Sequence, residues 1–304
     1  MTHFADRLLS AVRAKGNALC VGLDPRWENL PQEIRTRHNP DSLDAVARAC
    51  EEFCLRVLDV VAPLVPVVKP QSAFFEACGP RGMRALQRVL GRARDLGLCT
   101  ILDSKRNDIA STATAYADAA FGGVLIEGRR FPVWDADSMT VSPYLGRDAI
   151  EPFLEAARRD CRGVFVLVRT SNGGSGQFQS LSCEERPLFL HVGAAVRAWS
   201  RENLGQCGYG DVGAVIGATH KAELAILRAQ MPENIFLVPG FGAQGANAED
   251  TLPAFRADGL GAVVNSSRAI LFPYEPDDAH WERKINDAAK QAIAQLAMAQ
   301  KRDG

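Results

Sequence analysis

The sequence lacks the features of a membrane protein, a secreted protein or a nucleic-acid-binding protein. No apolar run approaches the roughly 20 residues that cross a bilayer, and the N-terminus does not have the shape of a signal peptide. Acidic and basic residues are interspersed and nearly equal in number, 36 against 35, so no basic tract indicates nucleic acid. The sequence therefore predicts no membrane and no nucleic-acid partner.

Cysteine and histidine show no pattern typical of disulfides or metal binding. The eight cysteines include no C-x-x-C pair, and several lie in or beside apolar segments, where cysteine packs as a small hydrophobic residue. This usage is typical of a reduced, cytoplasmic protein. The five histidines are isolated from one another, so the sequence predicts no metal site.

The chain does contain a regular alternation of short apolar runs and longer amphipathic segments. The apolar runs cover 18–23, 65–69, 98–103, 138–141, 163–168, 212–216, 235–238 and 261–264. Each is expected to be a strand buried on both faces, as parallel strands are. Helical patterns are clearest at 43–61, 82–96, 148–159, 187–202, 221–229 and 281–299. Eight such units predict an α/β fold, a (β/α)8 TIM barrel, with an open doubly wound sheet as the alternative.

The domain organisation is expected to be simple. No linker or change in composition divides the chain, so we expect residues 1–304 to form a single barrel domain. Leu8, Leu9 and Val12 have helical spacing and predict an N-terminal helix ahead of the first strand. Residues 121–137 are less regular and are interpreted as an insertion between the third helix and the fourth strand.

Charged side chains gather at the ends of the first three predicted strands. The stretch DSKRND at 103–108 follows the third strand, and residues two apart in a strand project to the same face, so Asp103 and Lys105 point the same way. A lone D-x-K would be interpreted as a surface ion pair. Asp24 and Lys69, however, end the first two strands. Since the C-terminal strand ends of a barrel meet at one mouth, these four charges together predict an active site.

The last two strand ends predict a phosphate site. Residues 240–245 read G-x-G-x-x-G. We reject a Rossmann dinucleotide site, because that fingerprint normally opens the first strand–helix unit and only one further strand follows here. Exposed glycine amides before a helix still favour an anion, and Arg268 after the next strand can add a forked positive charge. A glycine-rich turn beside a surface arginine is the alternative.

The glycine-rich loop at 171–177 leaves two interpretations open. It contains three glycines between small polar residues. Such a loop can be a lid that closes over a substrate or simply a flexible turn. The sequence does not separate these possibilities.

The stretch LDSKRNDIAST at 102–112 resembles the D-x-K-x-x-D-I-x-x-T signature of the orotidine 5'-phosphate decarboxylases. Five further segments resemble that family, its longer bacterial branch in particular: CVGLDPR at 20–26, VKPQ at 68–71, RTSN at 169–172, VIGAT at 215–219 and PGFGAQG at 239–245. The resemblance extends from about residue 3 to about residue 275. It implies a homodimeric TIM barrel that converts orotidine 5'-monophosphate to UMP and carbon dioxide, the last step of UMP biosynthesis, without metal or organic cofactor.

The resemblance also implies which residues carry the chemistry. The catalytic set would be an alternating charge array of Lys69, Asp103, Lys105 and Asp108. Lys105 would stabilise the carbanion at C6 of the pyrimidine and then protonate it. Asp103 would face the substrate carboxylate. Asp108 would come from the neighbouring subunit, together with Ile109 and Thr112.

The substrate-binding set implied by the resemblance is larger. It comprises Asp24, Ile109, Thr112, Ser171, Gly242, Gln244, Gly245 and Arg268. Asp24 and Lys69 would hold the ribose hydroxyls, and Ser171 would contact the pyrimidine. Gln244 and Arg268 would grip the phosphate.

Two alternative functions remain open from the sequence. A sugar-phosphate decarboxylase or hexulose-phosphate synthase on the same barrel would need magnesium and a carboxylate at the end of the second strand, where this chain has Lys69. A non-catalytic nucleotide-binding barrel would have no need for Asp103 to face an anion.

Overall fold

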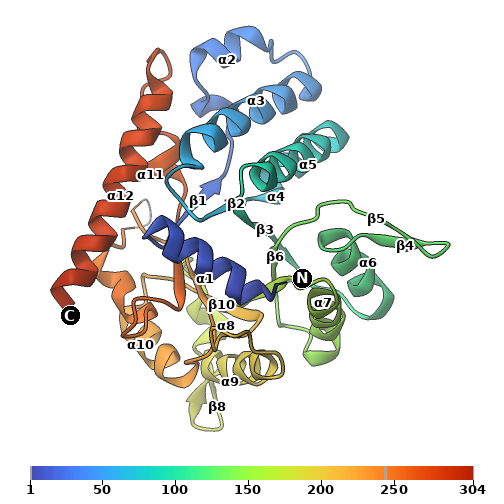
Figure 1. Cartoon of the computed structure of the whole chain (residues 1–304), viewed down its shortest axis with the longest axis vertical. Helices are drawn as coiled ribbons and strands as arrows, with labels where there is room; N and C mark the ends of the chain where they lie inside the picture. Colours follow the sequence, from blue (N-terminus) through green and yellow to red (C-terminus); the bar gives the residue numbers. More distant parts are fainter. Residues whose placement is uncertain (1, 243–244, 304) are drawn as a thin grey trace.

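The computed structural model describes residues 2–242 and 245–303, and eight strands of this part form a closed parallel barrel (Figure 1). Their order around the barrel is β1-β12-β11-β10-β7-β6-β3-β2. Their bounds are β1 Leu19–Leu23, β2 Val67–Pro70, β3 Cys99–Arg106, β6 Ser138–Val141, β7 Gly163–Arg169, β10 Val212–Ile216, β11 Phe236–Val238 and β12 Ala262–Ser266. The predicted TIM barrel is confirmed, and the open doubly wound sheet is wrong because β1 pairs with both β2 and β12.

Helices pack around the outside of the barrel (Figure 1). The longer ones are α3 Leu43–Val61, α5 Gly79–Asp95, α6 Ala110–Ala120, α7 Arg147–Arg159, α9 Leu188–Arg201, α10 Lys221–Gln230 and α12 Trp281–Asp303. Short helical segments are η1 Trp27–Asn29, α2 Gln32–Arg37, α4 Ser72–Glu76, α8 Gly176–Gln179, η2 Glu249–Ala254 and α11 Arg268–Leu271. In α3, the Ser42 hydroxyl accepts the Ala45 N–H as an N-cap, and Phe53, Val57 and Val61 lie buried on one stripe.

Most of the strands begin or end one to three residues away from the predicted apolar runs, and the differences at the second and third strands have identifiable causes or consequences. The second strand begins at Val67 rather than at 65, because the Val65 N–H still donates to the Val61 carbonyl and prolongs the preceding helical turn. The third strand extends beyond 103 to Arg106, which pairs with Val141 after a shift in register. This extension carries the charged segment along the barrel wall.

Helix α1 (Phe4–Lys15) closes the N-terminal end of the barrel. Its buried face packs on residues inside the barrel, and the Phe4 ring meets Phe165 edge-on with centroids 6.1 Å apart. Gly163 makes this approach possible, since a Cβ there would lie 2.2 Å from the Phe4 ring. The predicted N-terminal helix is confirmed. Because α1 covers the N-terminal end of the barrel, the opposite end is left for a site.

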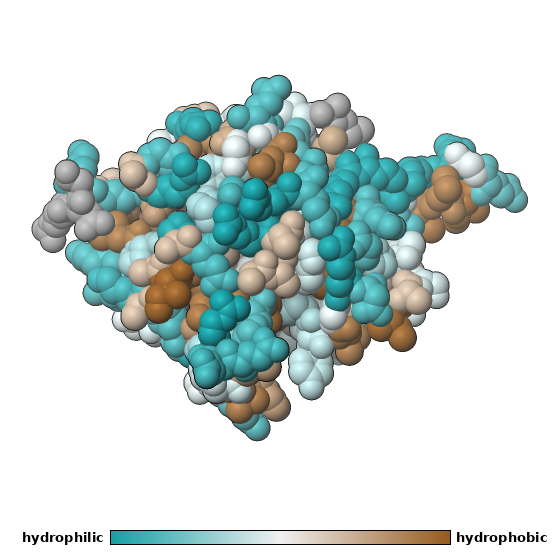
Figure 2. Space-filling view, turned by 90° about the horizontal axis from the view of Figure 1, so that it is seen from below, coloured by the Kyte–Doolittle hydropathy of each residue, from teal (hydrophilic) through white to brown (hydrophobic). Residues whose placement is uncertain are grey.

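The irregular segment at 121–137 contains an antiparallel hairpin, β4 (Val124–Ile126) and β5 (Arg129–Phe131). The hairpin projects to the right beside α6 in Figure 1, and Figure 2 shows apolar side chains on it in brown. Leu125, Ile126 and Phe131 are exposed there. A second short hairpin pairs β8 (Ser182–Cys183) with β9 (Arg186–Pro187). The assignment of residues 1–304 to a single domain stays a prediction.

The described helices include none with the length and apolar character that a bilayer crossing requires.

Candidate active site

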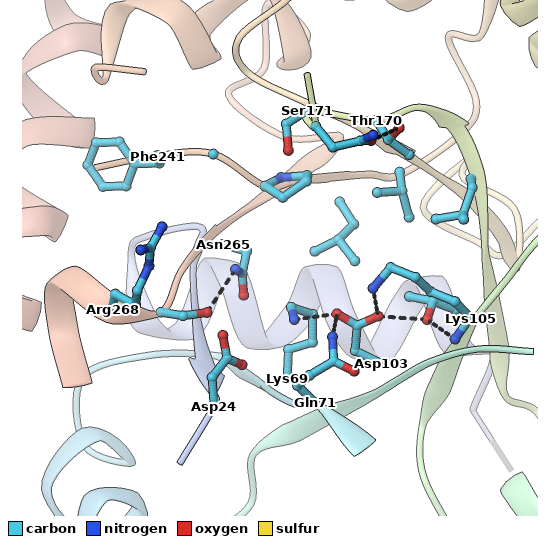
Figure 3. Close-up of a pocket in the computed structure, with 18 of the residues that line it drawn as sticks. Asp24, Lys69, Gln71, Asp103, Lys105, Thr170, Ser171, Phe241, Asn265 and Arg268 are labelled. Atoms are coloured by element: carbon cyan, nitrogen blue, oxygen red, sulfur yellow. Dashed lines mark hydrogen bonds and ion pairs between the residues drawn. The ribbon is translucent and has the colours of Figure 1, made fainter. Parts of the chain in front are cut away.

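A cavity of about 470 Å³ opens at the C-terminal ends of the strands (Figure 3). Each of the eight barrel strands contributes at least one lining residue, in the strand or directly after it. The polar and charged side chains among the lining residues are Asp24, Lys69, Gln71, Asp103, Lys105, Thr140, Thr170, Ser171, Asn172, Gln179, Asn265, Ser267 and Arg268. The four charges predicted to meet at one mouth therefore do line one cavity.

The end of β3 has an unusual backbone that directs its charged side chains into the cavity. The pairing of β3 with β6 shifts register between Leu102 and Arg106, and Lys105 has a left-handed backbone with φ of 47°. A left-handed conformation is unfavourable for a residue with a side chain and persists where the surroundings enforce it. The N–H groups of Ser104 and Lys105 both donate to the hydroxyl of Thr140, at 3.1 and 2.9 Å. These two bonds tie the end of β3 to β6.

The Asp103 carboxylate is the centre of the charged cluster. Among the described residues it accepts hydrogen bonds from four side chains, two on each oxygen. Oδ2 accepts from Lys69 Nζ at 2.6 Å and from Gln71 Nε2 at 3.0 Å. Oδ1 accepts from Lys105 Nζ at 2.6 Å and from the Thr140 hydroxyl at 2.9 Å. A carboxylate offers about four lone-pair sites, so this one is saturated.

The two lysines keep this buried carboxylate ionised. Burial alone would raise the pKa of Asp103, but the charges and hydrogen bonds of Lys69 and Lys105 outweigh burial and hold its pKa well below the ordinary 3.8. Burial likewise opposes the charge of Lys69, and the carboxylates of Asp103 and Asp24 raise the pKa of Lys69 above its ordinary 10.5. The cavity thus brings the amino groups of two lysines into contact with one ionised carboxylate.

Asp24, Ser171 and Arg268 line the same cavity from other strand ends. The Oδ1 atom of Asp24 is buried and has no hydrogen-bond partner among the described residues, so it can accept from a ligand. Ser171 lies against Gly217, where a Cβ would come within 2.7 Å of the Ser171 Cβ. Arg268 follows β12 at the start of α11. Figure 3 shows Arg268 and Lys105 on opposite sides of the hollow.

Five described residues of the predicted site do not line the cavity of their own chain: Gly242 and Gly245 of the loop after β11, and three residues around the start of α6. Asp108, Ile109 and Thr112 are absent from its described lining. The Asp108 carboxylate accepts the backbone N–H of Ile109 at 2.8 Å, and the residue Ile109 is 55% exposed. Thr112 is exposed on the first turns of α6. One chain therefore brings together Lys69, Asp103 and Lys105 but not the fourth charge of the expected array.

The glycine loop after β11 is arranged differently from a simple cradle of free amides. The Gly242 N–H donates to the Ala246 carbonyl at 3.0 Å, and the Gly245 N–H donates to the Gly242 carbonyl at 3.2 Å. Gln244 lies outside the described residues. The helix that follows is the 3₁₀ segment η2, whose first turn carries Glu249 and Asp250 and does not favour an anion. Arg268 lines the cavity beside the described residues of this loop and supplies a positive charge there.

The loop after β7 is held by side chains rather than left as an open turn. The Gln179 side chain accepts the Thr170 N–H at 2.9 Å and donates to the Thr170 hydroxyl at 2.8 Å. Arg169 is buried and donates to Ser175 Oγ at 3.0 Å while pairing with Glu223. These contacts give the loop a defined conformation, and its action as a lid stays a prediction.

Sequence reasoning assigned no role to Thr140 or Gln71, although both donate to Asp103. Thr140 lies within a run interpreted only as a buried strand. In the sequence pattern, a threonine there cannot be told apart from any other β-branched residue of a strand. Gln71 immediately follows Lys69-Pro70 at a strand end. Its position at the C-terminal end of a barrel strand could have indicated a role in the site. Both roles depend on which strands are neighbours.

The described residues contain no group of three or more His, Cys, Asp or Glu side chains that could hold a metal ion. The polar side chains that line the cavity offer ammonium, guanidinium, hydroxyl, amide and carboxylate groups to a ligand.

Replacing Asp103 by Asn should reveal how much the charged cluster stabilises the fold. We expect the free energy of unfolding at pH 7 to fall by about 3–5 kcal/mol, because Lys69 would stay buried without its carboxylate partner. The folded pKa of Asp103 is depressed, so its stabilising contribution is complete above about pH 5 and is lost as the pH falls further. Urea unfolding of both proteins from pH 8 to pH 3 should show a difference that narrows below about pH 4.

The matched control is Asp287→Asn, because this carboxylate is 63% exposed and lies 3.9 Å from Arg283. It should change the free energy of unfolding by less than about 1 kcal/mol. A difference between wild type and Asp103→Asn that is the same at every pH would contradict the assigned ionisation.

Comparison with known proteins agrees with this geometry. The model of the orotidine 5'-phosphate decarboxylase / HUMPS family matches residues 17–280. The orotidine 5'-phosphate decarboxylase of Rhodopirellula baltica is 48% identical over 303 residues, which cover 97% of this chain and 99% of that protein. The corresponding protein of Caldicellulosiruptor saccharolyticus is 37% identical, over 90% of this chain and 91% of its own length.

A solved structure of Leishmania donovani OMP decarboxylase superposes with a TM-score of 0.76 at 33% identity, covering 99% of each chain. Family model, relatives and structural neighbour span nearly the whole chain. The chain belongs to the orotidine 5'-phosphate decarboxylase / HUMPS family.

Proposed function

We propose that this protein decarboxylates orotidine 5'-monophosphate to UMP and carbon dioxide, the last step of UMP biosynthesis. The observation that carries the proposal is the cluster of Lys69, Asp103 and Lys105 in one cavity, within the segments that resemble the family signature. Relatives that match almost the full length of the chain bear the name of this activity.

The reaction demands electrostatic stabilisation at a single carbon atom. Loss of carbon dioxide from C6 leaves an electron pair in an orbital in the plane of the pyrimidine, where the ring cannot delocalise it. A fixed cation beside C6 is therefore the most effective stabiliser, because it needs no reorganisation as the charge develops. The Lys105 ammonium meets this need, since its side chain is 45% exposed towards the cavity while Asp103 holds it at 2.6 Å. It then donates its proton to C6.

Repulsion between Asp103 and the substrate carboxylate is a smaller contribution. Two like charges about 4 Å apart at an effective dielectric of about 20 interact by about 4 kcal/mol, equivalent to roughly three powers of ten in rate. Asp103 is already neutralised by two ammonium groups in direct contact, so this value is an upper limit here. Most of the acceleration must come from Lys105 and from binding energy at the distant phosphate.

The remaining site residues are proposed to bind the substrate. The unpartnered Oδ1 of Asp24 supports a hydrogen bond to a ribose hydroxyl, with Lys69 beside it. Ser171 is proposed to contact the pyrimidine. Arg268, with Gln244 and the loop of Gly242 and Gly245, is proposed to bind the phosphate through charge-assisted hydrogen bonds.

The site is proposed to be completed in a homodimer. Asp108 does not line its own cavity, and the exposed Ile109 and Thr112 lie beside it at the start of α6. Donation of these residues by a second subunit would place the fourth charge of the array against the substrate.

A magnesium-dependent sugar-phosphate enzyme is the second candidate, since the family name also includes HUMPS. Lys69 disfavours this magnesium-dependent enzyme, because its ammonium group stands at the end of β2, where a metal-binding carboxylate would be needed. A non-catalytic nucleotide-binding protein is disfavoured by the position of Asp103 at the centre of the cluster.

The direct test is release of carbon dioxide from orotidine 5'-monophosphate by the purified protein, with and without EDTA. We expect turnover that EDTA does not change, because the proposed mechanism uses only side chains. Activity that disappears with EDTA and returns with magnesium would favour the second candidate. Binding of UMP without any release of carbon dioxide would favour a nucleotide-binding protein.

Replacing Lys105 by Ala removes the proposed proton donor. We expect turnover to fall by at least about 1000-fold, because both the cation beside C6 and its proton are lost. UMP affinity, measured by calorimetry, should change by less than about tenfold, since the phosphate and ribose contacts remain. The control is Lys290→Ala, which removes an exposed lysine of α12 that does not line the cavity. Near-normal turnover of Lys105→Ala would remove the assigned role.

Mixing two inactive variants tests whether subunits share their sites. Heterodimers of Lys105→Ala and Asp108→Ala should contain one intact site, so random pairing of equal amounts should restore about a quarter of wild-type activity. A mixture of Lys105→Ala with Asp103→Ala should restore none, because those two residues line the same chain's cavity. Confirmed heterodimers without recovery in the first mixture would contradict site sharing.

A further inference from the structure

Thr140 occupies a central position in the site although it carries no charge. It lies on β6, next to β3 in the barrel, and only 1% of the residue is exposed. Its hydroxyl makes three hydrogen bonds with described groups of β3: the N–H of Ser104, the N–H of Lys105 and the carboxylate of Asp103. The residue also forms part of the wall of the cavity.

The direction of each of these bonds follows from counting protons. A threonine hydroxyl has one proton and two lone pairs. The backbone N–H groups of Ser104 and Lys105 can only donate, so they occupy both lone pairs. The single proton must then be donated to Asp103 Oδ1, which is ionised and can only accept. The hydroxyl is fully used and has one possible orientation.

These bonds connect Thr140 to Lys105 by two routes. The first is the backbone, because the bond to the Lys105 N–H supports the left-handed conformation that side-chain-bearing residues rarely adopt. The second is the carboxylate, because Asp103 Oδ1 accepts both from Thr140 and from Lys105 Nζ. The base and the tip of the Lys105 side chain are therefore both positioned by the same hydroxyl.

We propose that Thr140 is a positioning residue for the reaction: its hydroxyl fixes the backbone of Lys105 and the carboxylate that aims the Lys105 ammonium at the reacting carbon. This inference rests on the proposed function. Thr140 itself transfers no proton, since its only proton is committed to Asp103. Its contribution is expected in the chemical step rather than in binding of the phosphate and ribose.

The experiment compares Thr140→Val, which keeps the shape and removes the hydroxyl, with Thr140→Ser, which keeps the hydroxyl. For Thr140→Val we expect kcat to fall about 10- to 100-fold, as displacement of a reacting group by about 1 Å does. KM and the Kd of UMP should stay within about threefold of wild type, because the binding contacts are unchanged. Thr140→Ser should restore kcat to within about threefold of wild type.

Thr100→Val is the matched control. Thr100 is also a buried threonine that donates to a carboxylate and accepts a backbone N–H, both of Asp137, but it lies near the start of β3, away from the cavity. It should lower the Tm like Thr140→Val while leaving kcat within about twofold of wild type. Thr140→Ala serves as a second variant without a hydroxyl if Thr140→Val does not fold.

The outcomes separate this inference from the proposed function. Wild-type protein without carbon dioxide release means that the proposed function is wrong. Active wild type with an unchanged kcat in Thr140→Val or Thr140→Ala overturns the positioning role. Equal losses in Thr140→Ser and Thr140→Val, or an equal loss of kcat in Thr100→Val, would show that general destabilisation is the cause and would also overturn it.

Discussion

The contact of one buried carboxylate with two ammonium groups is the interaction on which the whole site depends. Without Asp103, Lys69 and Lys105 would face each other as like charges, and Lys69 would be buried without a partner. Without the lysines, burial would raise the pKa of Asp103. The two buried charges, Lys69 and Asp103, therefore stabilise each other, and Gln71 and Thr140 satisfy the two remaining acceptor positions of the carboxylate.

The barrel supplies this cluster with a rigid frame and separates stability from function. The N-terminal end is filled by apolar side chains and closed by α1, so the packed core lies away from the charges. At the other end, the described lining combines three cationic side chains with two anionic ones, which complements a substrate that carries a phosphate and a carboxylate. Lys69, Lys105 and Arg268 provide the positive charge.

Much of the fold could be predicted because its signals are local. The apolar stripe of residues 43–61 matches the helix Leu43–Val61, and the run at 138–141 matches the strand Ser138–Val141. Parallel strands place their C-terminal ends at one edge, which is why Asp24, Lys69 and Asp103 could be predicted to meet. The conformation of the glycine loop could not be predicted in the same way. Its sequence does not show that the N–H groups of Gly242 and Gly245 donate hydrogen bonds to carbonyls of the same loop.

The sequence by itself determined which elements form and which charged side chains stand at strand ends. The spacing of apolar residues that predicts a helix or a strand is a property of residues close together in the chain. Only the tertiary structure decided the contacts between strands. The left-handed backbone of Lys105, the hydroxyl of Thr140 beneath it and the position of Asp108 outside its own chain's cavity all follow from register and chain path. Register depends on how the buried faces of two neighbouring strands pack against each other, so the sequence of one strand alone does not show where β3 shifts against β6.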